Sequence, residues 1–130
     1  MNCHHTVDVD IDGDMCIQID ALTPKAIKLH SCNECNRIIQ RGEHYRREIL
    51  KYGSKIFHHK YCDNCLSVRE VFFSNGWYYE QMWEQMTDFI AESDGRISEY
   101  QLTQLTKTAR DKILDAIEKY WAEQDTLMGD

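Results

Sequence analysis

The chain has 130 residues, of which 42% are hydrophobic and 11% aromatic, and its formal net charge is −7 at pH 7. This apolar content excludes an intrinsically disordered protein, and the length suits a single compact domain. No apolar run approaches the length of a membrane span, and the first residues lack the pattern of a signal peptide. We therefore expect a cytoplasmic protein with reduced thiols and no membrane partner.

The charge is distributed unevenly along the chain. Residues 1–24 and 61–130 carry net charges of −5 and −8, whereas residues 25–60 carry +6. A basic segment is therefore flanked by two acidic ones, and the acidic total favours a protein or basic-surface partner over nucleic acid.

The first 24 residues predict a β-hairpin. Apolar and acidic residues alternate over residues 7–12, apolar residues alternate again over 15–19, and Asp12-Gly13 supplies the turn. The acidic run imitates the start of an EF-hand loop, but its twelfth position is Ile19 rather than Glu, which argues against calcium. Four further potential metal ligands lie in this segment: Cys3, His4, His5 and Cys16. They allow either a second metal site or a frayed terminus with a buried thiol at Cys16.

Two Cys-x-x-Cys pairs are the strongest signal in the chain. Cys32 and Cys35 form the first pair, and Cys62 and Cys65 follow after 26 intervening residues. Without a secretion signal, this spacing predicts one four-thiolate zinc site rather than disulfides. His59 competes with Cys65 for the fourth position, and the softer thiolate favours Cys65.

The residues between the pairs predict a second hairpin and then a helix. The hairpin reaches Tyr61 and turns at Tyr52-Gly53-Ser54, and Asn36 suits the left-handed backbone that follows a Cys knuckle. The helix is expected from Asp63 to about Ser74, stopped by Asn75-Gly76. Cys65 then lies in its first turn, where the helix dipole favours the thiolate.

This order of knuckle, hairpin and helix over about residues 30–76 resembles the treble-clef zinc finger. The motifs Gly42-Glu43-x-Tyr45 and His59-x-x-Cys62-x-x-Cys65 are similar to those of LIM-type fingers, in which the His before the third Cys is a metal ligand. The resemblance implies an α+β fold with a hairpin in residues 1–24, a treble clef in 25–76 and an acidic helical segment in 77–130.

The whole chain is also similar to small, uncharacterised zinc proteins of tailed bacteriophages. The shared features are the lead-in Thr23-Pro24-Lys25-Ala26, the finger, and a Gly76-Trp77 segment entering acidic helices that end near Tyr120-Trp121. This resemblance implies a viral accessory protein acting in a bacterial host cytoplasm, and it supplies no activity.

Residues 77–130 predict about three helices. Ser98 is expected to cap a short helix that runs to about Leu105, Thr106 or Thr108 to cap the last one, and the tail beyond Ala122 to be loose. A Met and aromatic stripe at helical spacing is interpreted either as core or as a partner-binding groove. The residues in question are Trp77, Tyr78, Met82, Trp83 and Met86.

The functional hypotheses differ in the surface that they use. We find no catalytic site: His44, His58 and His59 imitate a treble-clef nuclease, but the helix lacks the His that such a site needs. The first hypothesis is therefore a non-enzymatic protein that binds a host or viral protein, one version being an inhibitor of a bacterial defence system. The alternative is nucleic-acid binding by the basic hairpin, with Tyr45 or Phe57 stacking on bases. Its candidate phosphate contacts are Arg37, Arg41, Arg46, Arg47, Lys51, Lys55 and Lys60. The partner and the oligomeric state are left open.

Overall fold

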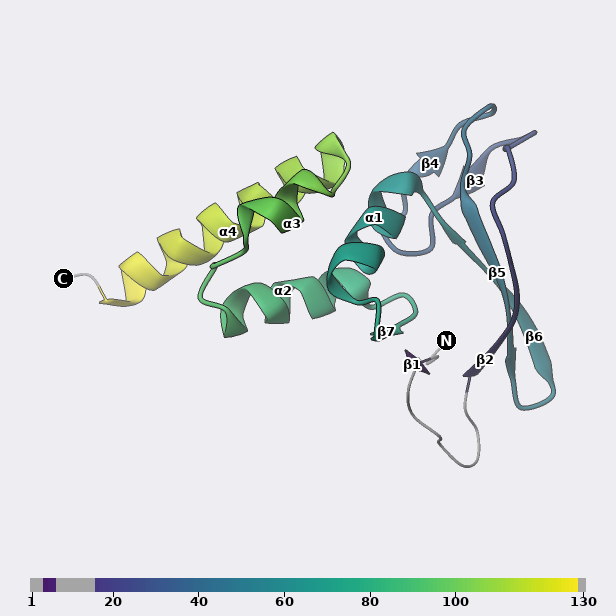
Figure 1. Ribbon diagram of the computed structural model, residues 1–130, viewed down its shortest axis with the longest axis horizontal. Helices are drawn as coiled ribbons and strands as arrows, with labels where there is room; N and C mark the ends of the chain where they lie inside the picture. Colours follow the sequence, from purple (N-terminus) through teal and green to yellow (C-terminus); the bar gives the residue numbers. More distant parts are fainter. Residues whose placement is uncertain (1–3, 7–15, 129–130) are drawn as a thin grey trace.

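The computed structural model describes residues 4–6 and 16–128, and these form an α+β fold with strands at one end and helices at the other (Figure 1). The strands are β1 (His4–Thr6), β2 (Cys16–Leu22), β3 (His30–Ser31), β4 (Ile38–Ile39), β5 (Arg46–Tyr52), β6 (Lys55–Tyr61) and β7 (Gly76–Tyr78). The helices are α1 (Asp63–Phe72), α2 (Met82–Glu92), α3 (Glu99–Thr103) and α4 (Lys107–Met128). The α+β class predicted from the sequence is confirmed.

A three-stranded antiparallel sheet has the order β2-β5-β6. The β5–β6 hairpin turns where it was predicted, at Gly53, whose φ of 62° is easily adopted by glycine. β2 pairs with β5, so that Leu22 lies opposite Arg47. The second arm of the predicted N-terminal hairpin thus adds a third strand to the β5–β6 hairpin, a pairing that the sequence did not predict. The first arm, residues 7–11, lies outside the described residues.

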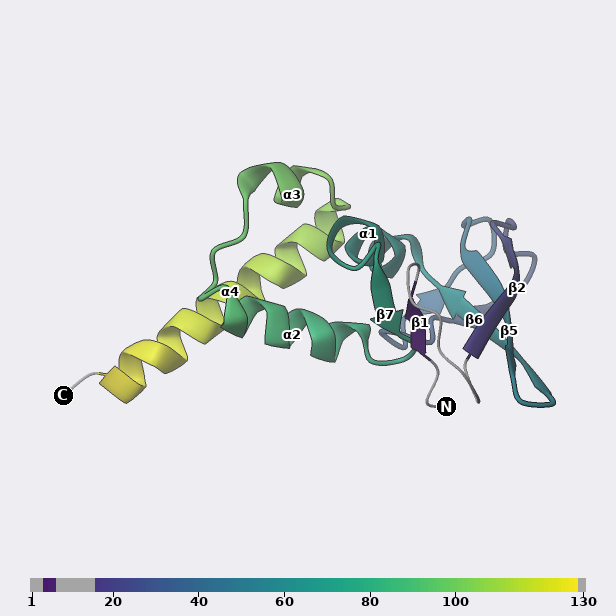
Figure 2. The ribbon, with the colours of Figure 1, turned by 60° about the horizontal axis from the view of Figure 1, so that its bottom comes forward.

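Two short antiparallel pairs complete the strands. β3 pairs with β4 around the first Cys pair, and Asn36 has the predicted left-handed backbone with a φ of 65°. β1 lies beside β7, with His4 opposite Tyr78 (Figure 2). The chain therefore returns from α1 to a strand that contacts its own N-terminal segment before α2 begins.

α2 and α4 pack their apolar faces into one core that they share with the sheet and α1. α2 buries Met82, Met86 and Ile90, and α4 buries Ile113 and Ile117. The apolar stripe, which the sequence allowed to be either core or a partner groove, is therefore part of the core. The stripes of the two amphipathic helices cover each other.

Side-chain caps begin the last two helices. Ser98 Oγ accepts a hydrogen bond from the Gln101 backbone N–H at 3.1 Å, and Thr106 Oγ1 accepts one from the Ala109 N–H at 3.2 Å. Both caps were predicted, the second as one of two alternatives. The expected loose tail beyond Ala122 is wrong: α4 continues to Met128, because no Gly or Pro follows until Gly129.

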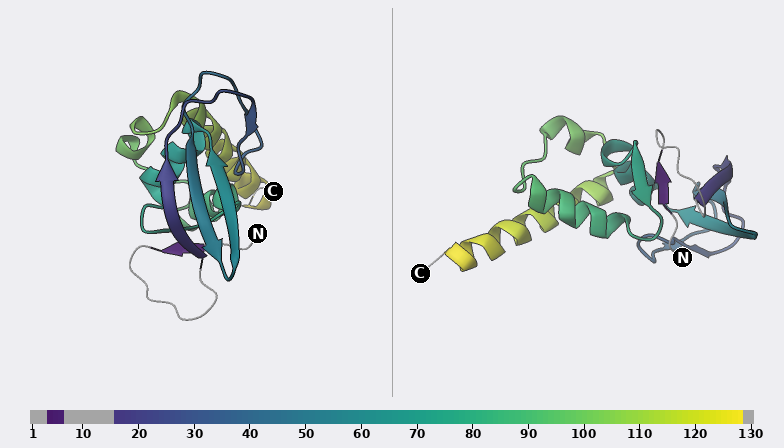
Figure 3. Two further views of the ribbon diagram at one scale, coloured as in Figure 1. Left: turned by 90° about the vertical axis from the view of Figure 1, so that its right-hand side faces the viewer. Right: turned by 90° about the horizontal axis from the view of Figure 1, so that it is seen from below.

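All four helices lie on one side of the β2-β5-β6 sheet. Figure 3 shows this sheet in front and the helices behind it when the molecule is viewed from the sheet end. α1 lies between the sheet and the other helices and contacts both β6 and α4. The opposite face of the sheet is not covered by any described helix.

Candidate metal centre

Four cysteines meet where the β3–β4 turn faces the start of α1. The distance between Cys32 Sγ and Cys65 Sγ is 3.7 Å, that between Cys35 Sγ and Cys62 Sγ is 3.8 Å, and all four sulfurs lie within 4.8 Å of one another. A tetrahedral ion bound at metal–sulfur distances of about 2.3 Å holds its sulfur ligands about 3.8 Å apart. Disulfide sulfurs lie about 2.05 Å apart, and all four cysteines here are free thiols. The cluster therefore fits one tetrahedral metal ion.

Local structure explains how the sulfurs converge. Asn36 turns the knuckle back, so that the Cys32 N–H donates to the Arg37 carbonyl at 2.8 Å and both thiols of the first pair point the same way. Cys62 is the N-cap residue of α1, which places Cys65 in the first helical turn. The helix N-terminus favours negative charge on that sulfur.

The cluster is enclosed and its thiols are coupled. Cys32, Cys62 and Cys65 are buried and Cys35 is partly buried. Hydrogen bonds with the other three thiols, above all with Cys35, lower the pKa of Cys32. The hydrogen bond with Cys32 instead raises the pKa of Cys65. One thiolate therefore forms at the expense of its neighbours, and a bound cation is needed to stabilise four of them together.

Two N–H groups donate to the sulfur ligands. The Cys62 backbone N–H donates to Cys32 Sγ at 3.3 Å, and Trp83 Nε1 donates to Cys65 Sγ at 3.3 Å. Such donors stabilise ligand thiolates and fix their orientation. Trp83 belongs to α2, and Lys112 Nζ of α4 lies over its ring, 3.8 Å from the ring centroid. The sequence left Trp83 open between the core and a partner groove, and it gave no sign that Trp83 reaches the metal centre.

His59 lies outside the sulfur cluster. Its Nε2 is 2.8 Å from Glu34 Oε2, and both side chains are buried. Glu34 also accepts backbone N–H groups from Glu80 at 2.6 Å and from Met82 at 3.1 Å. The carboxylate of the first knuckle thus caps α2, and His59 orients that carboxylate. Cys65 is the fourth member of the cluster, as the sequence favoured.

A second buried polar group lies under the sheet. Arg69 Nη1 of α1 donates to Glu48 Oε2 at 2.9 Å, and its guanidinium lies 4.4 Å from the Trp77 ring centroid and 4.7 Å from that of Tyr61. Burial is the strongest single influence on Glu48 and tends to raise its pKa, but the charge of Arg69 and the hydrogen bonds from Arg69, Tyr79 and Arg46 together lower that pKa. Burial also raises the pKa of Tyr61. This ion pair fastens α1 to β5, and no sequence motif indicated it.

Comparison with known proteins finds no matching family model, curated protein or solved structure. The function of the centre must therefore be argued from its geometry. In the described part of the chain, no helix combines the length and the apolar character needed to cross a membrane.

The seven basic candidates separate into different environments. Arg37 pairs with Glu43 at 2.7 Å and Arg46 with Glu48 at 3.2 Å, so both already have carboxylate partners. Arg41 is exposed in a turn and Lys55 is exposed at the start of β6, and the other three project from one face of β5 and β6: Arg47, Lys51 and Lys60. Tyr45 is buried and Phe57 packs against the core, so neither is available to stack on a base as expected.

The candidate partner stripe is mostly inside the protein. Trp77, Met82 and Met86 are buried, Trp83 is partly buried, and Tyr78 alone of the five is well exposed, at 46%. A groove built from these side chains is therefore not present in the described structure, because they fill the core between α2, α4 and the finger.

The histidines do not assemble a second metal site. His58 and His59 are consecutive residues of β6, so their side chains point to opposite faces of the sheet. A metal site needs at least three His, Cys, Asp or Glu side chains close together, and among the described residues only the four cysteines meet this condition. Cys3 and the side chains of His4, His5 and Cys16 lie outside the described part, so the second site near the N-terminus stays a prediction.

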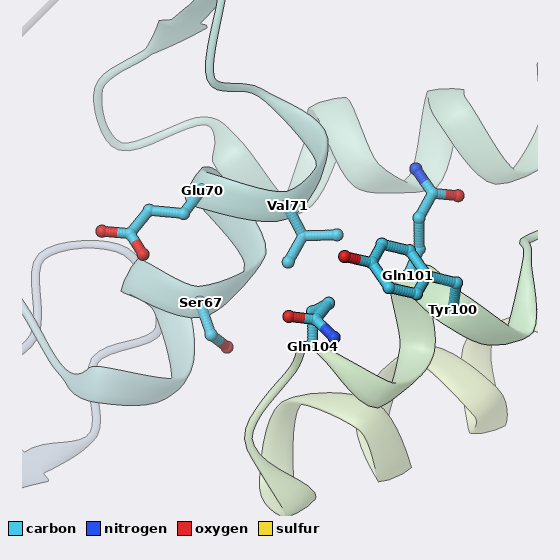
Figure 4. A pocket seen from close by; sticks show the side chains of 6 residues that line it. All are labelled: Ser67, Glu70, Val71, Tyr100, Gln101 and Gln104. Carbon is cyan, nitrogen blue, oxygen red and sulfur yellow. The ribbon is translucent and has the colours of Figure 1, made fainter.

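A separate cleft of about 570 Å³ lies between α1 and α3. Figure 4 shows Val71 facing Tyr100 and Gln104 across it, while the carboxylate of Glu70 points away from Tyr100. None of the four cysteines lines the cleft. Its polar groups are the Glu70 carboxylate, the Tyr100 phenol, the Gln101 and Gln104 amides, and the Ser67 hydroxyl, which donates to the Asn64 carbonyl at 2.8 Å.

Proposed function

We propose that the four cysteines bind one structural zinc ion and that residues 30–76 fold around it as a treble-clef finger. The observation that supports this is the pair of 3.7 and 3.8 Å sulfur separations in a buried cluster. Four protein ligands fill every position of a tetrahedral zinc ion, whereas catalytic zinc keeps one position for water. The ion would contribute folding free energy, roughly 10–16 kcal/mol in zinc-finger peptides.

Metal analysis tests this assignment directly. We expect one zinc per chain after purification without added metal, and release of four titratable thiols when zinc is removed. Iron in place of zinc would give visible thiolate-to-iron absorption and would overturn the choice of metal. A Cys35→Ser variant that keeps a full zinc ion would overturn the four-cysteine site itself.

We propose further that the protein is a non-enzymatic binding protein whose partner is another protein. The closed metal centre supports a scaffold role, and the aliphatic side chains exposed on the sheet support a protein partner. We propose that the protein acts in an infected bacterium, because its sequence resembles small phage zinc proteins. The narrower version is an accessory protein that inhibits a bacterial defence system.

Affinity purification from bacterial lysate tests the partner class. The zinc-loaded chain is used as bait with and without nuclease treatment, and bait stripped of zinc with a chelator is the control. A discrete protein that is retained after nuclease, and lost from the stripped bait, is the expected result. Recovery of nucleic acid, with nothing left after nuclease, would contradict it.

Nucleic-acid binding is the second candidate because three of the basic residues project from the same face of β5 and β6. Arg47 of β5 is directly opposite Lys60 of β6, and Lys51 lies further along β5. Phosphate contacts would give a steep fall of affinity with salt concentration. A salt-titrated binding assay with a single-stranded oligonucleotide therefore separates this candidate from protein docking.

A further inference from the structure

We propose that the uncovered face of the β2-β5-β6 sheet is a docking site for an acidic protein segment that carries aliphatic side chains. The inference rests on the proposed protein-binding function and names the surface and the partner chemistry. It puts the interaction surface on the sheet and not on the Met and aromatic stripe, for which a partner groove was one of the two interpretations.

Strand register defines this surface, which we call the outer sheet face. Residues directly opposite each other on neighbouring strands project to the same side of a sheet. Three rows run across the strands: Leu22, Arg47 and Lys60; Asp20, Ile49 and His58; Ile17, Lys51 and Ile56. The alternate residues of β5 and β6 point to the helices, and Glu48, Leu50, His59 and Tyr61 among them are fully buried.

The outer sheet face exposes aliphatic side chains that no described element covers. Ile17 is 51% exposed, Leu22 40% and Ile56 53%. Ile49 lies between them in the central strand and is partly exposed. Four of the nine positions are thus aliphatic on a surface from which the helices are excluded (Figure 3). Contiguous exposed apolar surface of this kind marks interaction sites.

The charge of the face selects an acidic partner. Arg47, Lys51 and Lys60 contribute three positive charges and Asp20 one negative charge, in a protein whose net charge is −7. None of these three cations forms an ion pair with a described residue, in contrast to Arg37 and Arg46. Desolvating cations is favourable only if anions replace the water, so the partner must supply carboxylates.

The composition of the face favours protein over nucleic acid. Single-stranded nucleic acids are bound by aromatic side chains on which bases stack. The nine positions include no Phe, Tyr or Trp, since the aromatic residues of β5 and β6 occupy inward-facing positions. Aliphatic side chains between cations instead match a peptide in which acidic and aliphatic residues alternate. β5 has seven residues, and a peptide of about eight would span its length of roughly 23 Å.

An eight-residue peptide of alternating valine and glutamate is the probe. Zinc-loaded full-length protein, labelled with ¹⁵N, is titrated with this peptide, with a valine–lysine peptide of the same length, and with a twenty-nucleotide oligothymidylate. We expect the valine–glutamate peptide to bind and to shift the amide signals of β5 and β6. A Lys51→Glu/Lys60→Glu variant should bind it about tenfold more weakly, because each reversal removes one attraction and adds one repulsion.

Lys107→Glu/Lys119→Glu is the matched control, since it makes the same charge change on α4. It should bind within twofold of the unmodified protein, and both variants should retain one zinc. Equal binding of the two peptides, shifts confined to the helices, or equal weakening by both variants would overturn the inference. Binding of oligothymidylate alone on the same strands would also overturn it, in favour of nucleic acid.

The lysate experiment separates this inference from the function on which it rests. If the unmodified bait retains no protein, the proposed binding function fails. If it retains a protein that the Lys51→Glu/Lys60→Glu bait retains equally, the binding function stands and the outer sheet face is wrong.

Discussion

Replacing Glu34 by alanine should destabilise the protein although Glu34 is not a metal ligand. Glu34 lies between Cys32 and Cys35, and its side chain is completely buried. It accepts hydrogen bonds from His59 Nε2 at 2.8 Å and from the Met82 N–H at 3.1 Å. α2 begins at Met82, and Gln81 gives it no side-chain cap, so the carboxylate serves as its cap from 48 residues away.

The expected loss follows from the donors that the substitution leaves behind. A buried donor without an acceptor costs about 1–3 kcal/mol. His59 and Met82 are buried, whereas the third donor, the N–H of Glu80, belongs to an exposed residue that water can reach. Counting the two buried donors gives a loss of about 3 kcal/mol, a large part of the 5–15 kcal/mol by which a typical domain is stable.

Urea unfolding at saturating zinc, followed by circular dichroism, measures this loss. Glu43→Ala is the matched control, because Glu43 also pairs with a basic side chain, but in a pair whose side chains are 39% and 33% exposed. Exposed pairs contribute less than about 1 kcal/mol. If the two variants lose equal stability while both keep their zinc, the buried cap does not stabilise the fold as argued.

Three further outcomes are expected. Cys35→Ser should lose zinc and most of its structure, whereas His59→Ala should keep one zinc and only become less stable; metal analysis with circular dichroism distinguishes them. Trp83→Phe keeps the ring but removes the donor to Cys65, so zinc affinity measured by chelator competition should fall about tenfold. Arg69 holds the pKa of Glu48 below its ordinary value, so this carboxylate stabilises the fold above about pH 4 and loses that effect as the pH falls through its folded pKa. The stability gap between the unmodified protein and Glu48→Gln, measured in urea, should therefore stay nearly constant from pH 7 to about pH 5 and narrow as the pH falls below about 4; a gap that stays constant below pH 4 would contradict the assigned shift.

Local signals explain what could be predicted from the sequence. The Cys-x-x-Cys spacing, the left-handed Asn36 and the Gly53 turn each depend on a few neighbouring residues, and each lies where it was expected. The Ser98 cap needs only the Gln101 backbone three residues ahead. These features were accessible because propensity and capping act over short stretches of chain.

The contacts that were missed join residues that are distant in sequence. Trp83 reaches Cys65 across 18 residues, Arg69 reaches Glu48 across 21, and the Glu34 carboxylate reaches α2 across 48. No periodicity predicts such pairs, because they depend on how α1 and α2 pack. The same packing determines that Met82 and Met86 are buried in the core, because an apolar stripe on a helix can pack either into a core or against a partner.

The metal centre connects the two halves of the molecule through these distant contacts. On one side, Asn33 of the knuckle accepts the Lys60 N–H at 2.7 Å and donates its own backbone N–H to the Lys60 carbonyl at 2.8 Å, which fixes the end of β6. On the other side, Trp83 and Glu34 attach α2 to the same knuckle and helix start. Lys60 belongs to the outer sheet face but touches no metal ligand side chain. Loss of the metal should therefore release both the end of β6 and the start of α2. Lys60 would then no longer be held opposite Arg47, so the outer sheet face keeps its arrangement of cations only while the metal centre is intact.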